Sequence, residues 1–335
     1  MRIAVDAMGG DHAPRETVRG AVAAAKDLDG LSRVILVGDE KAINMELARC
    51  GGSCDKIDIH HASEVVEMDE SPALAIRRKK DSSIGRAVDL VKKGEADAVV
   101  SAGNTGAVVV AATLKLRTLE GIERPAIAAI MPTKDHPFVL VDAGANMDCS
   151  PKLISQFAIM GSVYSRVIMG QENPIVGLLS IGGEDIKGNE ITKESFGLLS
   201  ELDLNFRGNI EGHDLFEGET DVVVCDGFVG NVVLKTSESI AHAIGHWLKQ
   251  EFTRNLVRKL GAGLLSGALR TMKHRLDPEM YGGAPLLGVK GVCIITHGAS
   301  SYRAIFHAIR VAAESVHHHL NQVIVSETGK MGRLQ

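Results

Sequence analysis

The chain has 335 residues, a formal net charge of −5 and 45% hydrophobic residues, which is enough apolar material for a substantial core. The charges are mixed along the chain and aromatic residues make up only 4% of it. A nucleic-acid-binding surface usually needs a basic excess and stacking side chains, so no nucleic acid partner is expected.

Near the N-terminus, the sequence runs directly into a strand pattern at residues 3–5, with no signal peptide before it. The most apolar stretch, residues 96–116, is interrupted by polar residues and two glycines. It falls short of the roughly 20 apolar residues that a membrane span requires. We therefore expect a cytoplasmic protein, attached to a membrane only peripherally if at all.

Short apolar runs alternate with helical patterns along the chain. A helix is expected from Pro14 to Asp27, another after residue 106, and a third that opens at residues 81–85. Runs that are apolar on both faces are typical of strands covered by helices on both sides. They occupy residues 3–5, 34–37, 98–101, 126–131, 138–142, 175–180, 222–226 and 291–296. The pattern predicts a three-layer α/β/α fold with a largely parallel sheet.

No proline- or serine-rich linker divides the chain. The sequence therefore predicts a single α/β domain over residues 1–335, in one or two lobes. A basic amphipathic helical arm is expected at about residues 250–280.

Small and polar residues follow six of the predicted strands. In open parallel sheets, ligands bind beyond the carboxyl ends of the strands, and glycine loops that lead into helices aim free N–H groups at anions. One such loop is more often a simple tight turn, but several at corresponding strand ends predict a shared anion pocket. The candidate phosphate or substrate ligands are Asp6, Gly9, Gly10, His12, Asn104, Thr105, Gly106, Asp142, Asn146, Gly182, Gly183 and Gly230.

Several familiar site motifs are missing from the sequence. It has no P-loop, no dinucleotide-binding glycine motif after the first strand and no nucleophile elbow. The five cysteines are irregularly spaced and match no disulfide framework or common zinc pattern. Free thiols are the better interpretation, and neither a metal nor a cofactor is expected.

An enzyme without a covalent nucleophile can still transfer an acyl group, because bound phosphate can itself attack a carbonyl. Lys187 lies between glycine turns and could hold phosphate, and Asn231 could donate to the developing oxyanion. His12 or His297 could act as a general base, although a structural histidine is the commoner case. Phosphate is largely dianionic near neutral pH, so a strong base is not required.

Residues 253–276 form a basic island, since no acidic residue occurs between Glu251 and Asp277. Glycines within it predict two short helices rather than one. The segment could lie on an anionic membrane surface, contact a second subunit, receive an acidic carrier protein or form an ordinary core helix. Its leucines recur at helical spacing beside basic residues, as Leu256, Leu260, Leu264, Leu269, Arg258 and Lys259 illustrate.

Several motifs occur in an order that resembles the PlsX family of bacterial phosphate acyltransferases, over residues 1 to about 325. They are Met-Arg-Ile-Ala-Val-Asp-Ala-Met-Gly-Gly-Asp-His-Ala-Pro at the start, Ser-Ala-Gly-Asn-Thr-Gly-Ala from Ser101, Asp-Ala-Gly-Ala-Asn from Asp142, Ile-Gly-Gly-Glu from Ile181, Lys-Gly-Asn-Glu from Lys187 and Asp-Gly-Phe-Val-Gly-Asn-Val from Asp226.

The resemblance implies a fold similar to isocitrate and isopropylmalate dehydrogenases and phosphotransacetylase. It implies transfer of a fatty acyl group from acyl carrier protein to inorganic phosphate, with the acyl phosphate feeding phospholipid synthesis. A homodimer that associates peripherally with the membrane is expected, and residues 253–276 match the region of dimer and membrane contact. By the same resemblance, Lys187 and Asn231 are the catalytic positions.

Two alternatives stay open at this point. A β-decarboxylating dehydrogenase of the same fold would need an arginine cluster and metal-binding aspartates, which Asp221 and Asp226 do not obviously supply. A non-catalytic scaffold would bind lipid or carrier protein without turnover.

Overall fold

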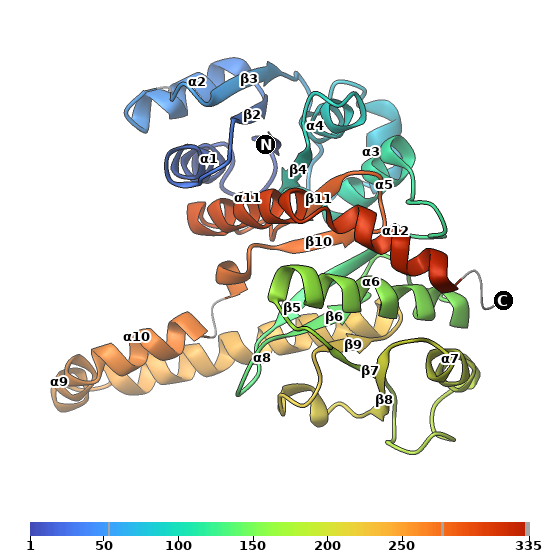
Figure 1. Ribbon diagram of the computed structural model, residues 1–335. Coiled ribbons are helices and arrows are strands. Elements are labelled where there is room, and N and C mark those ends of the chain that lie inside the picture. The colour runs from blue at the N-terminus through green and yellow to red at the C-terminus, as the bar shows by residue number, and fades with distance from the viewer. Residues whose placement is uncertain (53, 276–277, 332–335) are drawn as a thin grey trace.

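The computed structural model describes residues 1–52, 54–275 and 278–331 (Figure 1). Its eleven strands form one sheet in the order β3-β2-β1-β4-β11-β10-β5-β6-β9-β7-β8. The strands are β1 (Arg2–Asp6), β2 (Arg33–Gly38), β3 (Ile57–His61), β4 (Ala98–Ser101), β5 (Ala126–Met131), β6 (Phe138–Val141), β7 (Ile175–Leu179), β8 (Asn205–Ile210), β9 (Val222–Val224), β10 (Ala284–Leu287) and β11 (Val292–Ile295).

Helices connect most of these strands. They are α1 (Arg15–Asp27), α2 (Glu40–Arg49), α3 (Pro72–Arg78), α4 (Ser83–Lys92), α5 (Thr105–Leu116), α6 (Pro151–Met169), α7 (Glu190–Ser200), α8 (Gly227–Thr253), α9 (Leu256–Leu264), α10 (Ser266–Arg275), α11 (Tyr302–His317) and α12 (Leu320–Met331), with short 3₁₀ helices at Asp214–Phe216 and Pro278–Tyr281. Leu276, the last leucine of the basic segment, lies outside the described residues.

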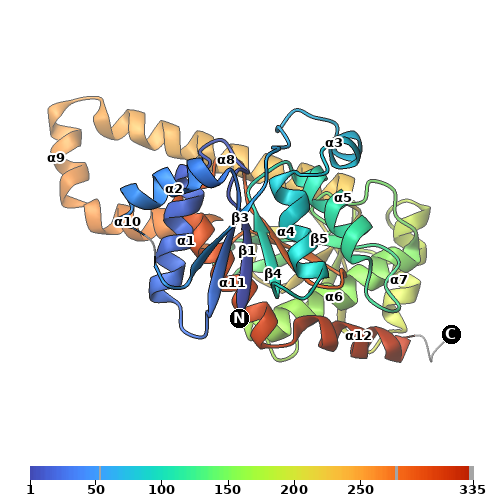
Figure 2. The same cartoon turned by 90° about the horizontal axis from the view of Figure 1, so that it is seen from above.

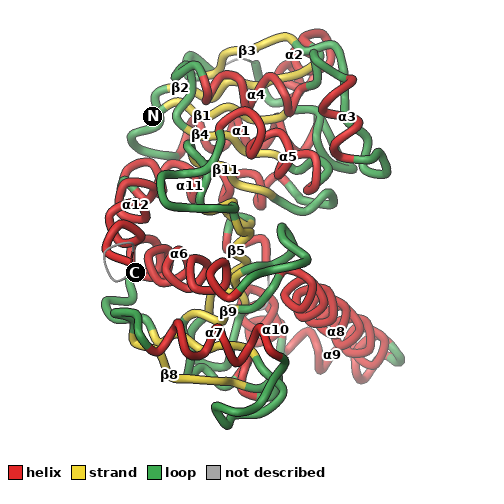
Figure 3. Tube along the Cα trace, turned by 90° about the vertical axis from the view of Figure 1, so that its right-hand side faces the viewer, coloured by secondary structure: helices red, strands yellow, loops and turns green. Residues whose placement is uncertain are grey.

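The sheet is divided into two blocks of parallel strands, which Figure 3 shows one above the other. The first block holds β1–β4 and β11, and the second holds β6–β9. Strands β10 and β5 lie between the blocks, and three antiparallel pairings there reverse the strand direction. The predicted three-layer fold with a largely parallel sheet is confirmed.

Alternating side chains of the strands pack on opposite faces of the sheet, as the two-residue period of a strand requires. In β1, Ile3 and Val5 pack with α1 and α11, whereas Ala4 packs with α4 and α5. In the second block, Val139 packs with α6, whereas Phe138 faces the side of Leu215. Helices therefore cover both faces of the first block, and the core lies on both sides of the sheet.

All the predicted strands are present, and three further strands were missed. Strands β3 and β8 are the two edges of the sheet, where polar residues interrupt the apolar pattern. Strand β10 has only four residues and contains Pro285, which conceals it from a pattern search. The predicted helix at residues 14–27 and the division of the basic segment into two helices are confirmed.

The six polar loops do not follow one row of strand ends, because the two blocks run in opposite directions. The shared anion pocket stays a prediction. The loops fall into a first-block group after β1, β4 and β11 and a second-block group after β6, β7 and β9. The eleven strands form one sheet, but the prediction that the chain folds as a single domain stays a prediction.

Close packing of α1 on α11 depends on Gly20. A Cβ atom added there would lie 2.6 Å from both the Ile305 Cβ and the Tyr302 carbonyl oxygen. We expect Gly20→Ala to lower the free energy of unfolding by about 2 kcal/mol, because the helices must move apart. Urea denaturation followed by circular dichroism measures this change.

A matched control is Gly197→Ala in α7, where an added Cβ would meet no atom within 4 Å. This substitution should raise the stability by up to about 1 kcal/mol, because alanine is the better helix former. Equal stabilities of the two variants would contradict the proposed close contact.

Candidate functional site

The neighbouring strands β6, β9 and β7 lie side by side and run in the same direction, so their carboxyl ends meet at one edge of the second block. The loops after these strands lead into α6, α8 and α7. Ser150, Asp226 and Asn189 cap the three helices, and the side chain of each accepts a hydrogen bond from an N–H of the first turn. Three helix N-termini, with their partial positive charges, therefore gather at this edge.

Asp142 organises the loop between β6 and α6. Its Oδ1 atom accepts hydrogen bonds from the backbone N–H groups of Ile127 (3.0 Å), Gly144 (3.1 Å) and Ala145 (3.0 Å). Its Oδ2 atom accepts from the backbone N–H (2.7 Å) and the side-chain amide (2.8 Å) of Asn146. Asp142 is fully buried, and this burial raises the pKa of its carboxyl while the hydrogen bonds oppose the shift.

The first turn of α8 is pressed against the same loop. A Cβ atom added at Gly230 would lie 1.9 Å from the Asp142 carbonyl oxygen, and one at Gly227 would lie 2.5 Å from the Asn146 carbonyl oxygen. Only glycine allows this approach. It brings Asn231 beside Gly144, where an added Cβ would be 3.4 Å from the Asn231 side chain.

Lys187 lies on the loop between β7 and α7. Its side chain is exposed and forms no ion pair with another described residue. An added Cβ at Gly182 would lie 2.7 Å from the Lys187 Cγ, so this glycine makes room for the lysine stem. Gly183 next to it is exposed and faces open space. The lysine ammonium group is therefore available to an anionic ligand.

The three asparagines of the prediction have different surroundings. Asn104 caps α5 and donates to the carbonyl oxygens of the loop at residues 67–70, and Asn146 donates to Pro125 and Asp142. Asn231 is half-buried, and its amide makes no hydrogen bond within the described part of the chain. Asn231 is thus the one of the three that is free to bind a substrate.

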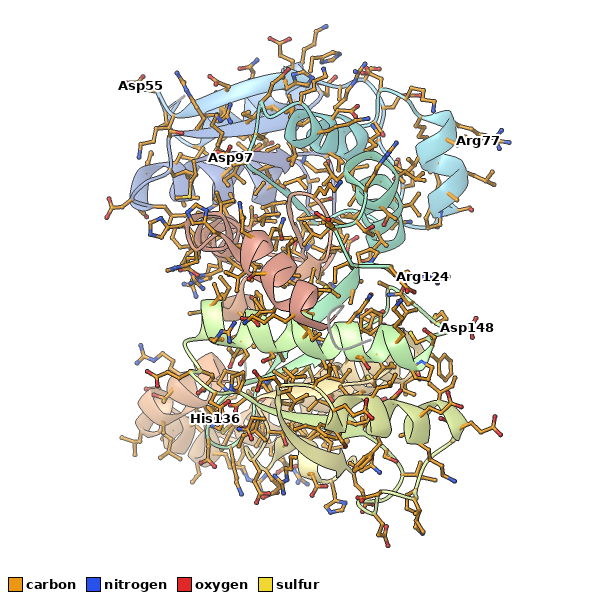
Figure 4. The ribbon with its side chains drawn as sticks, turned by 45° about the vertical axis from the view of Figure 1, so that its right-hand side comes forward. Asp55, Arg77, Asp97, Arg124, His136 and Asp148 are labelled. Carbon is orange, nitrogen blue, oxygen red and sulfur yellow. The ribbon has the colours of Figure 1, made fainter. Side chains whose placement is uncertain are left out.

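A cleft of about 550 Å³ opens beside these loops, between the starts of α6, α7 and α8. Figure 4 shows Arg124 and Asp148 on the same side of the molecule, at the end where α6 begins. Burial raises the pKa of the Cys149 thiol to about 11, so the thiol is protonated near neutral pH. The residues that line the cleft are Met147, Asp148, Cys149, Ser150, Ile191, Asp226 and Phe228.

In the first block, Asp6 accepts hydrogen bonds that position a loop, as Asp142 does in the second block. It is buried, accepts hydrogen bonds from the Ser101 hydroxyl (2.7 Å) and the Met8 N–H (3.3 Å), and its pKa is raised by burial. Gly9 packs against it, since an added Cβ would lie 2.6 Å from the Asp6 Oδ2. Gly10 has a φ of +99°, which favours glycine. These contacts favour loop positioning over direct contact with an anion for both aspartates.

The remaining first-block candidates surround the start of α5. Thr105 is exposed, and Gly106 touches Pro72, whose Cγ would lie 2.5 Å from an added Cβ. His12 and His297 are both exposed, and the His297 Nδ1 accepts a hydrogen bond from the Ala299 N–H (3.2 Å). The structure brings these residues together around β1, β4 and β11, apart from the second-block loops in the order of the sheet.

Helix α5 connects the two groups. It begins in the first-block group at Asn104, and the hydrophobic cluster beneath it includes Ala143 of the second-block loop. Two further residues, Ala145 of the same loop and Leu234 of α8, also pack against this cluster. The ligand roles of the candidate residues stay predictions, but both groups lie on elements that share one part of the core.

Sequence reasoning missed the apolar side chains of the cleft. Three of them, Met147, Ile191 and Phe228, lie beside or within a polar loop motif, and the polar residues of the motif are the stronger pattern. A large apolar residue inside a glycine-rich loop, such as Phe228 in Asp-Gly-Phe-Val-Gly-Asn, is the pattern that would have found them.

Helices α9 and α10 of the basic segment, together with the far part of α8, form an arm that projects from the body of the molecule (Figures 1 and 2). Leu256, Leu260 and Leu264 are 75%, 67% and 89% exposed, and α9 has no buried residue. The interpretation of α9 as an ordinary core helix is therefore wrong, because no described residue covers its leucines. Leu269 is half-buried, Lys259 is exposed and Arg258 pairs with Glu251.

In the ranges that the structure describes, no helix combines the length and the apolar character that crossing a bilayer requires. The same residues contain no group of three or more histidine, cysteine or acidic side chains placed to hold a metal ion.

The chain is similar in sequence to known proteins. Residues 1–323 match the family described as "Fatty acid synthesis protein". The phosphate acyltransferase of Pelotomaculum thermopropionicum is 51% identical over 326 residues, which is 97% of this chain and 94% of that protein. The phosphate acyltransferase of Geobacter sulfurreducens is also 51% identical and covers 96% of this chain and 92% of its own length.

Solved structures of the same fold include a phosphotransacetylase from Streptococcus pyogenes, with a TM-score of 0.60, 19% identity and 94% of both chains covered. The EutD phosphotransacetylase from Staphylococcus aureus matches with a TM-score of 0.59 and 16% identity, again over 94% of both chains. At these identities the likeness demonstrates a shared fold.

The network around Asp142 leads to a prediction on stability. Asp142→Asn replaces one carboxylate oxygen with an NH₂ group that faces N–H donors, so at least one buried donor loses its partner. We expect the free energy of unfolding to fall by about 2–4 kcal/mol. Urea denaturation measures the loss.

Asp148→Asn is the control, because Asp148 is exposed and makes no hydrogen bond within the described part of the chain. It should leave the stability within about 0.5 kcal/mol of the unsubstituted protein. An Asp142→Asn variant as stable as this control would show that the loop does not depend on the carboxylate.

Proposed function

The chain belongs to the family described as "Fatty acid synthesis protein", and on that premise we propose that it transfers an acyl group from a thioester to inorganic phosphate. The observation that supports this activity most directly is that Lys187 lies on the loop after β7 and Asn231 lies at the start of α8, which follows the neighbouring strand β9. Both side chains lack partners in the described part of the chain, and three helix N-termini lie at the same edge.

Phosphate is the nucleophile in this proposal. The Lys187 ammonium group and the N–H groups of the helix N-termini hold its negative charge and aim one oxygen at the thioester carbonyl. The new carbon–oxygen bond forms a tetrahedral intermediate, and the Asn231 amide donates to its negative oxygen. The carbon–sulfur bond then breaks, the sulfur leaves with the electron pair as a thiolate, and acyl phosphate is released.

Direct attack is supported by the state of the thiol that lines the cleft. Cys149 lines the cleft, but its raised pKa of about 11 keeps it protonated, whereas a nucleophilic cysteine needs a thiolate. The buried carboxyls of Asp6 and Asp142 are occupied by hydrogen bonds that position the loops. Phosphate needs no strong base near neutral pH, so His12 and His297 need not remove a proton.

Acyl carrier protein is the acyl donor that we propose, and the acyl phosphate would serve phospholipid synthesis. The family description as a fatty acid synthesis protein and the resemblance of the loop motifs support this choice. A β-decarboxylating dehydrogenase is not favoured. Its candidate metal ligands are Asp221 and Asp226, which lie at opposite ends of β9. A hydrogen bond of 2.9 Å joins the Asp221 Oδ1 to the His136 Nε2.

The exposed arm supports a second part of the proposal, that the protein forms a homodimer and attaches peripherally to an anionic membrane surface. Leu256, Leu260 and Leu264 offer apolar area, and Lys259 adds positive charge beside them. Such a surface can bury its leucines in the headgroup region or against a second copy.

The activity is tested by incubating the full chain with palmitoyl acyl carrier protein and labelled phosphate, followed by identification of the product. Labelled palmitoyl phosphate is the expected product. Reduction of a nicotinamide cofactor with hydroxy acids, or binding of the donor without turnover, would instead support the dehydrogenase or the scaffold.

Lys187→Ala should lower the rate of acyl phosphate formation at least about 100-fold, because it removes the charge that holds phosphate. Lys193→Ala is the control, since Lys193 is also exposed and unpaired within the described residues and lies six positions away. If Lys187→Ala formed acyl phosphate as fast as this control, the role in phosphate binding assigned to Lys187 would be contradicted.

The paired substitution of Leu260 and Leu264 by Glu should weaken flotation with anionic vesicles or lower the sedimenting mass, since it places charges in the apolar face of α9. Leu114→Glu provides the control, because Leu114 is 68% exposed on α5, away from the arm. If flotation and mass stayed unchanged in the double variant, both contacts proposed for the arm would be excluded.

A further inference from the structure

The cleft beside the candidate catalytic loops is lined by apolar side chains that face solvent. Met147 is 57% exposed, Ile191 is 43% exposed and Phe228 is 60% exposed, and all three line the same concave space of about 550 Å³. Large apolar side chains that gather in a concave site mark a place where a ligand or partner binds. A volume of this size lies within the range of small-molecule pockets.

Residues that line the cleft lie close in sequence to both candidate catalytic residues. Phe228 and Asn231 are three residues apart in the first turn of α8, so they share one face of the helix. Ile191 lies in the first turn of α7, four residues after Lys187. A ligand that lies along Ile191 and Phe228 therefore extends from the place where the proposed acyl transfer occurs.

None of the side chains that line the cleft is a lysine or arginine, and two of them are the carboxylates of Asp148 and Asp226. The lining side chains therefore offer less to an anion than Lys187 does on the loop after β7. An uncharged hydrocarbon chain needs no cation and gains from contact with Met147, Ile191 and Phe228. The lining thus suits the neutral tail of an acyl group, whereas Lys187 suits phosphate.

We infer that this cleft holds the alkyl chain of the acyl donor while its carbonyl lies between Lys187 and Asn231. The inference rests on the proposed function and adds the place and the chemistry of chain recognition. Its consequence is a preference for long chains, because each methylene buried in the cleft strengthens transition-state binding.

The first measurement is kcat/KM of the full chain for butyryl, octanoyl and palmitoyl thioesters of one carrier protein with inorganic phosphate. If each added methylene is fully buried, kcat/KM should rise about fourfold per methylene until the cleft is full. Equal values for all three donors would overturn the inference, because the chain would then gain nothing from binding.

The second measurement repeats this series with Met147→Ser, Ile191→Ser and Phe228→Ser. We expect each variant to lower the ratio of palmitoyl to butyryl kcat/KM by about tenfold, since one apolar wall is lost. Met45→Ser is the matched control, because Met45 is 61% exposed on α2 and does not line the cleft. It should keep the ratio of the unsubstituted protein.

Two outcomes of this series count against the alkyl-chain site. If the three variants lower kcat/KM equally for the butyryl and palmitoyl donors, the cleft supports the loops without contacting the alkyl chain. A reduced sedimenting mass with an unchanged ratio would assign Met147, Ile191 and Phe228 to contact with a second copy.

A binding measurement separates failure of the inference from failure of the proposed function. The variant carries Phe228→Trp and Trp247→Phe, so that the single tryptophan reports on the cleft. Its emission should shift to shorter wavelength with a palmitoyl thioether of pantetheine and stay unchanged with the butyryl thioether. If no donor yields acyl phosphate, the proposed function fails. The emission shift then still supports the alkyl site, and its absence overturns it.

Discussion

The buried carboxylate of Asp142 is the interaction on which the rest of the site depends. Five N–H groups converge on its two oxygens, and they come from the start of β5 and from the loop that leads to α6. A buried carboxylate is costly unless such donors satisfy it, so the loop has few other conformations available. The first turn of α8 then rests on this loop through Gly230 and Gly227.

Buried polar side chains position the backbone, whereas Asn231 and Lys187 stay unpaired within the described residues. Side chains such as Asn104 and Asn146 are used to hold backbone segments, and Asp6 and Asp142 hold the loops that follow β1 and β6. Electrostatic stabilisation of a transition state is effective when the donors are placed in advance. The buried polar groups thus hold backbone segments in place, whereas Lys187 and Asn231 are free to contact a substrate.

Charge and apolar surface are separated within the second block. Lys187 and the helix N-termini provide positive potential, whereas Met147, Ile191 and Phe228 provide apolar area next to two carboxylates. An acyl transfer to phosphate needs both kinds of surface, because one substrate is an anion and the other carries a hydrocarbon chain. The exposed leucines of the arm form a separate apolar surface away from the sheet.

The sequence by itself determined the fold class, the buried strands and the family, because continuous apolar runs and glycine motifs are local patterns. It also predicted the two helices of the arm from three glycines. Only the tertiary structure decided which loops meet, since the three antiparallel pairings among β11, β10, β5 and β6 reverse the strand direction and divide the polar loops into two groups. It also decided that Asp142 is buried beneath its loop while Asn231 is free, because hydrogen-bond partners distant in sequence are set by strand pairing.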